Sequence, residues 1–134
     1  MAKLTDILGI NARTDYLRLN FKQARRKADD KLVTKRILRR EKIPHPRLLG
    51  RLKTREEIGR FDWSPLLGGF VIKPAQGLGG KGVLVIRKKV PDKNKWLVGG
   101  GKPIGVEDLR LHASDIVEGR YSRNGLPDIA MVEE

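Results

Sequence analysis

The clearest hydrophobic pattern lies in the middle of the chain. Residues 70–75 and 83–86 are short apolar runs rich in β-branched side chains, and a glycine-rich segment separates them. Runs of this length and composition predict two β-strands that form a hairpin with a glycine-rich tip. Within the first strand, alternation puts Lys73 on the face opposite Phe70 and Ile72.

Patterns on either side of this hairpin predict an α+β fold. A helix is expected to begin at the Asp29-Asp30 pair, whose carboxylates can cap free N–H groups, and to end near Glu41, before two prolines. Apolar residues recur at helical spacing over residues 106–117, and Gly119 follows as a stop. The shorter expected elements are a strand over residues 47–52, a helical turn over 54–61, a strand over 95–98 and the start of a strand at 128–132.

Composition narrows the possible classes of protein. The chain has no cysteine, which excludes a disulfide scaffold, a zinc finger and a thiol nucleophile, and its two histidines exclude a His-rich metal site. No apolar run approaches the roughly 20 residues of a membrane helix, and the first six residues do not resemble a signal peptide. A cytoplasmic protein without a membrane span is therefore expected.

Positive charge is concentrated in the N-terminal part of the chain. The net charge is +13, and residues 1–60 contain 18 Lys and Arg against 7 Asp and Glu. Such an excess attracts polyanions, so a small basic nucleic-acid-binding protein is an alternative function. The scattered aromatic residues and the lack of a nucleic-acid motif weigh against it. Residues 1–28 are expected to be mostly irregular, with the basic run Lys22–Lys27 as a solvated surface.

The same interpretation applies to the basic face of the helix predicted to follow. Lys31, Lys35 and Arg39 lie at i,i+4 spacing and therefore share one face of that helix. A basic helix face is usually only solvated, and a solvated face is the expectation here.

The glycine segment carries the main chemical signal. Gly77-Leu-Gly79-Gly-Lys-Gly82 satisfies the loose pattern G-x-G-x-x-G, but a strand follows it instead of the helix of a Rossmann turn. A Walker A loop requires Ser or Thr after Gly-Lys, and Gly82 stands there. What remains is a strand–loop–strand flap, whose glycines let backbone N–H groups approach phosphate oxygens closely.

The lysine on the strand before the flap has two open interpretations. A lysine among apolar neighbours is costly to bury without a partner, and a bound phosphate could be the partner of Lys73. Alternatively, the hairpin is purely structural and the Lys73 side chain reaches water. The pattern alone favours neither.

The stretch FVIKPAQGLGGKGVLVI, residues 70–86, resembles the phosphate-covering hairpin of ATP-grasp enzymes. More narrowly, it is similar to the alpha-L-glutamate ligase-like, sugar-transfer-associated ATP-grasp proteins. Further segments resemble the same group in order along the chain: Ile7–Arg13, Ala28–Lys35, Ile43–Pro46, Asp108–Glu118, Tyr121–Ser122 and Pro127–Glu133. The resemblance implies the N-terminal portion of an ATP-grasp fold, with residues 1–28 preceding an incomplete ATP-grasp domain at residues 29–134.

The resemblance also implies a function and a binding site. The function is that of an ATP-dependent carboxylate–amine ligase, which uses ATP and Mg²⁺ and forms an acyl phosphate; the acid and amine substrates stay unidentified. The implied ATP-binding residues are Lys31 and Lys73 at the phosphates, Gly77, Gly79 and Gly80 in the flap, and Val132, Glu133 and Glu134 at the hinge strand, whose backbone pairs with adenine.

The resemblance places the Mg²⁺ ligands and most of the carboxylate site downstream of Glu134. No catalytic residue and no metal ligand is therefore expected within the chain. The chain is expected to be a truncated, ATP-binding fragment that is inactive alone. Leu78 and Lys81 depart from the small polar and acidic residues common in the family.

Overall fold

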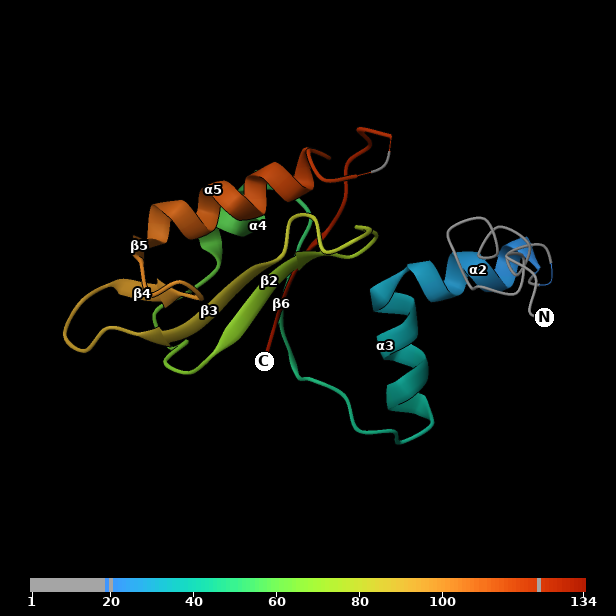
Figure 1. Cartoon of the computed structure of the whole chain (residues 1–134), viewed down its shortest axis with the longest axis horizontal. Helices are drawn as coiled ribbons and strands as arrows, with labels where there is room; N and C mark the ends of the chain where they lie inside the picture. Colours follow the sequence, from blue (N-terminus) through green and yellow to red (C-terminus); the bar gives the residue numbers. More distant parts are fainter. Residues whose placement is uncertain (1–18, 20, 123) are drawn as a thin grey trace, which may run out of the picture.

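The computed structural model describes residues 19, 21–122 and 124–134. Its helices and antiparallel sheet confirm the α+β class (Figure 1). In chain order, the elements are α2 (Lys22–Asp29), α3 (Lys31–Arg40), β1 (Leu48–Leu52), α4 (Arg55–Arg60), β2 (Phe70–Pro74), β3 (Leu84–Lys89), β4 (Lys95–Val98), β5 (Pro103–Gly105), α5 (Val106–Val117) and β6 (Ala130–Glu133). Among the helices of this described part, none is long and apolar enough to cross a membrane.

The six strands form one antiparallel sheet in the order β1-β6-β2-β3-β4-β5. β6 lies between β1 and β2, so that Val132 is opposite both Gly50 and Ile72. β2 and β3 are neighbours with Phe70 opposite Ile86, and the glycine segment connects them. Helices α4 and α5 cover one face of the sheet, while α2 and α3 project from the rest of the molecule (Figure 1).

The apolar core lies between the sheet and the α4–α5 layer. Phe70 and Ile72 of β2 are buried there, whereas Lys73 is only half-buried, as strand alternation predicts. Trp63 and Trp96 are both buried, and the Trp96 indole N–H donates a hydrogen bond of 2.8 Å to the Leu66 carbonyl oxygen. The remaining buried members of the core are Leu52, Ile58, Ile86, Leu109, Ala113, Ile116, Val117, Ala130 and Val132.

Side-chain caps account for the start of α3, which confirms the helix predicted after Asp30. The Asp30 carboxylate accepts hydrogen bonds from the N–H groups of Leu32 at 2.9 Å and Val33 at 3.1 Å. These bonds satisfy two of the backbone donors that a helix leaves free at its first turn. α5 ends at Val117, and Gly119 follows it as predicted: the φ of Gly119 is +84°, and a Cβ there would lie 2.3 Å from the Leu126 carbonyl oxygen.

Two expectations need correction. The segment predicted to be irregular includes α2, which begins at Lys22 and buries none of its residues. Its Lys, Arg, Gln and Ala residues all favour helix, and Arg26 and Lys27 in its last turn suit the negative end of the helix dipole. A helix without an apolar face gives no hydrophobic periodicity to detect. The three-residue strand β5 was not predicted. The segment Ile7–Arg13, which belongs to the family resemblance, lies outside the described residues.

Candidate functional site

The face of the sheet opposite the core carries a buried ion pair. Glu133 of β6 is opposite Val71 of β2, and Lys73 is opposite Met131, so both charged side chains belong to this face. The Lys73 ammonium contacts the Glu133 carboxylate through Oε1. Only 6% of the Glu133 side chain and 24% of the Lys73 side chain is exposed. The partner of Lys73 within the chain is thus a carboxylate, which neither sequence interpretation included.

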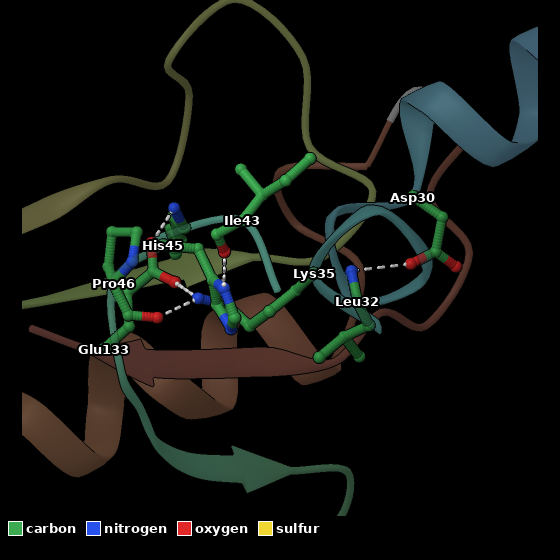
Figure 2. A network of polar contacts seen from close by, with 8 residues as sticks. Asp30, Leu32, Lys35, Ile43, His45, Pro46 and Glu133 are labelled. Atoms are coloured by element: carbon green, nitrogen blue, oxygen red, sulfur yellow. Dashed lines mark hydrogen bonds and ion pairs between the residues drawn. The ribbon is translucent and has the colours of Figure 1, made fainter. Parts of the chain in front are cut away.

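Glu133 also holds helix α3 against the sheet. The Lys35 Nζ lies 2.9 Å from Glu133 Oε2 and donates a further hydrogen bond to the Pro46 carbonyl oxygen (Figure 2). The Lys35 side chain is 13% exposed, so the prediction that this helix face is merely solvated is wrong at Lys35. Burial raises the pKa of Glu133, but hydrogen bonds and charge from Lys73 and Lys35 outweigh burial and lower that pKa.

Lys31 connects the start of α3 to the glycine segment. Its backbone N–H donates to the Ala75 carbonyl oxygen at 3.0 Å, and its ammonium donates to the Gly77 carbonyl oxygen at 2.8 Å. Burial lowers the pKa of Lys31 and the charge of Lys73 lowers it further, although Asp128 acts in the opposite direction. The two lysines are therefore near enough to repel each other, and an anion between them would relieve that repulsion.

The tip of the glycine segment is open. Gly79 and Gly80 have φ values of +64° and +74°, and no atom lies within 4 Å of the position that a Cβ would take at either residue. At Gly77, by contrast, a Cβ would lie 2.2 Å from Pro74 Cγ. Among the residues that the structure describes, none accepts a hydrogen bond from the N–H of Gly77, Gly79 or Gly80. These N–H groups are free to bind an anion.

Both ends of the glycine segment are anchored by residues that the sequence did not single out for this role. The buried Asp128 carboxylate accepts a hydrogen bond from the Gln76 N–H at 3.1 Å. His112 Nε2 lies 2.9 Å from the Gly82 carbonyl oxygen, and a Cβ at Gly82 would be 2.6 Å from the Tyr121 ring. The glycine segment thus has two anchored ends and an open tip.

The predicted hinge residues at the end of β6 have side chains in different surroundings. The Val132 side chain lies in the core, and the Glu133 side chain faces the lysines. The register with β2 ends at the pair formed by Val71 and Glu133. Beyond it, the Glu134 N–H donates to the Arg47 carbonyl oxygen at 3.0 Å, on the β1 side only. The β2 side of Glu134 is therefore outside the ladder.

The described residues do not form a metal site. They include no group of three or more His, Cys, Asp or Glu side chains positioned to hold a metal ion. The Glu133 carboxylate is already held by Lys73 and Lys35.

Residues 11–134 match the sequence model of the family described as "Sugar-transfer associated ATP-grasp", and the chain belongs to this family. ATP-grasp enzymes generally use ATP and Mg²⁺, and membership of this family indicates an ATP-dependent enzyme. No curated protein and no solved structure matches the chain.

Proposed function

We propose that this chain carries the ATP-binding residues of a carboxylate–amine ligase similar to the alpha-L-glutamate ligases. In this reaction a carboxylate oxygen attacks the γ-phosphorus of ATP, ADP leaves and an acyl phosphate forms. An amine then attacks the acyl carbon, inorganic phosphate leaves, and the nitrogen loses a proton. The observation that carries the proposal is the convergence of Lys31 and Lys73 beside a loop with free N–H groups.

Electrostatics supports phosphate as the ligand of the two lysines. The charge of Lys73 contributes to the lowered pKa of Lys31, so a multiply charged anion placed between the two ammonium groups would relieve their repulsion. Gly77, Gly79 and Gly80 then contribute N–H donors from the other side, without side chains in the way. Donors fixed in this manner stabilise the charge that spreads over a transferring phosphoryl group.

A phosphate that binds to Lys73 has to compete with the ion pair between Lys73 and Glu133. A phosphate oxygen must share or take over the Lys73 ammonium, which the Glu133 carboxylate holds in the absence of a ligand. Glu133 keeps Lys35 as a second partner, at 2.9 Å, so that it stays compensated when Lys73 turns to a phosphate. Leaving this buried carboxylate with neither lysine would cost far more free energy than leaving it with Lys35 alone.

The sheet surface next to the end of β6 is apolar, which supports this place as the adenine-binding part of the site. Val71 and Val85 are opposite each other in the register of β2 and β3, on the face that also carries Glu133. Val71 is half-buried and Val85 is 48% exposed, which leaves an apolar surface for a flat base. Glu134 lies beyond the last pair with β2, and its N–H already donates to the Arg47 carbonyl oxygen, so the base edge would pair with the hinge strand where the ladder with β2 ends.

The proposal predicts a selective loss of nucleotide affinity in the variant Lys73→Ala. Because a hydrogen bond to a charged group contributes about 1.5–3 kcal/mol, the Kd for Mg·ATP should rise roughly tenfold or more. The measurement is isothermal titration at two ionic strengths, with circular dichroism to verify the fold. The matched control is Lys102→Ala, an exposed lysine before β5, which should bind as the unchanged protein does. Equal affinity of the two variants would contradict the proposal.

A further inference from the structure

A second cationic surface lies between helix α3 and strand β1. It is a groove of about 530 Å³, and its basic lining residues are Lys35, Arg36, Arg39, Arg47 and Arg51. The first three come from α3 and the last two from β1 and the segment before it, so the cations face a common space from two elements. No carboxylate lines this groove, which we call the α3–β1 groove.

Only part of this positive charge is compensated within the chain. Lys35 is paired with Glu133, and the Arg47 guanidinium is paired with Glu134 at 2.6 Å. In the part of the chain that the structure describes, Arg36, Arg39 and Arg51 have no ion pair. Three guanidinium groups around one concave surface produce a positive potential that attracts anions.

We propose that the α3–β1 groove binds a small molecule with at least two anionic groups, phosphate or carboxylate, at a site separate from the nucleotide site. The planar guanidinium group suits both anions because it donates two parallel hydrogen bonds to either of them. The groove has the volume of a typical small-ligand site. Its remaining lining includes Leu32 and Leu48, which offer an apolar surface to the body of the ligand.

One carboxylate separates this groove from the site proposed for ATP. Lys35 lines the groove and contacts Glu133 Oε2, whereas Lys73 contacts the other oxygen of the same carboxylate. The two sites are therefore adjacent, but the cations proposed to bind the ligand differ: Arg36, Arg39 and Arg51 in the groove, and Lys31 and Lys73 in the nucleotide site. Binding in the groove does not depend on the proposed ligase function.

The experiment titrates the chain with sodium pyrophosphate and, separately, with citrate, at constant ionic strength and without metal. Isothermal titration measures the Kd, and amide NMR shifts locate the binding. We expect saturable binding with shifts in α3 and β1, and a Kd roughly tenfold or more higher in the double variant Arg39→Gln/Arg51→Gln. The matched control, Arg60→Gln/Lys102→Gln, removes the same charge outside the groove and should leave the Kd unchanged.

The outcomes separate this proposal from its rivals. Binding of pyrophosphate supports a phosphorylated ligand, and binding of citrate supports a polycarboxylate. The proposal is overturned if neither anion binds, or if the control variant weakens binding as much as the groove variant does. It is also overturned if a single-stranded oligonucleotide displaces pyrophosphate with a steep salt dependence, because the groove would then belong to a nucleic-acid surface.

The nucleotide site is tested in the same samples. If Lys73→Ala abolishes pyrophosphate binding and ATP displaces pyrophosphate completely, the groove is part of the nucleotide site and the proposal of a separate site is wrong. If ATP fails to bind while the groove variant still weakens pyrophosphate binding, the proposed ligase function fails and the groove proposal stands.

Discussion

The two faces of the sheet are stabilised by different interactions. On one face, α4 and α5 pack against an apolar core that includes two buried tryptophans. On the other, neither α2 nor α3 buries a residue, and Lys31 and Lys35 connect α3 to the sheet through polar contacts. An anionic ligand cannot replace the apolar contacts of the core, whereas a phosphate can replace a carboxylate as the partner of an ammonium group. One side of the sheet is thus held by apolar packing, and the other side, held by polar contacts, is the side proposed to bind nucleotide.

The largest effect is expected from the core face. Trp96→Ala removes a side chain with 0% exposure and should lower the free energy of unfolding by about 3–5 kcal/mol, since it leaves a cavity and an unpaired Leu66 carbonyl oxygen. Urea denaturation followed by circular dichroism measures the change. The control Leu111→Ala, at a 63% exposed position on α5, should change stability by less than about 0.5 kcal/mol. A Trp96 variant as stable as this control would show that the core is not the stabilising side.

A smaller effect is expected on the polar face from Glu133→Gln, which keeps the shape and removes the charge. The free energy of unfolding at neutral pH should fall by about 1–3 kcal/mol, because the ammonium groups of Lys35 and Lys73 lose their shared partner but keep some contact with water. Glu56→Gln, which breaks the exposed pair with Arg60, is the matched control and should change little.

The effect of Glu133→Gln should also depend on pH. The pKa of Glu133 is below its ordinary value of 4.5 in the folded protein, so the unfolded chain takes up a proton first as the pH falls. Its contribution is therefore fully present above about pH 4.5 and is lost as the pH falls through the lower folded pKa. Urea curves of both proteins at pH 7 and pH 3 should show the stability difference shrinking at the lower pH. A constant difference would mean that the charge of Glu133 is not what stabilises this face.

The smallest effect is expected at the start of α3. Asp30→Ala removes the oxygen that caps the N–H groups of Leu32 and Val33 and should destabilise the helix by about 1 kcal/mol. Amide hydrogen exchange should detect faster opening in α3, with little change in β2 or α5. Asp30→Asn keeps a capping oxygen and should exchange nearly as the unchanged protein does. Equal acceleration in both variants would point to the charge of Asp30 instead of its cap.

How well the sequence predicted each part depended on whether the signal was local. β2 was predictable because its apolar run is short and β-branched, and α3 because Asp30 caps it and prolines follow it. α2 was missed because it has no buried face. The expectation that Lys31 and Lys73 share a site with the glycine loop came from family resemblance and stays a prediction.

The partners of the site lysines could not be predicted in the same way. The contact between Lys73 and Glu133 depends on where β6 enters the sheet, which no local pattern contains. Two adjacent carboxylates at the end of an apolar strand, Glu133 and Glu134, were the available signal, and nothing local showed which of them would meet Lys73. The α3–β1 groove likewise joins residues from two elements whose relative position only the tertiary structure defines.

The central position of β6 has a consequence for the folding of the chain. β2, β3, β4 and β5 pair with their sequence neighbours, so these hairpins close short loops and can form early. β1 instead pairs only with β6, which is far from it in the sequence. Arg47 and Glu134, which meet at the end of this pair of strands, are 87 positions apart in the chain. Because closing so long a loop is entropically costly, we expect insertion of β6 to be the slow step of sheet formation. The same step brings Glu133 to Lys73, so the face proposed to bind nucleotide would be assembled only when β6 has entered the sheet.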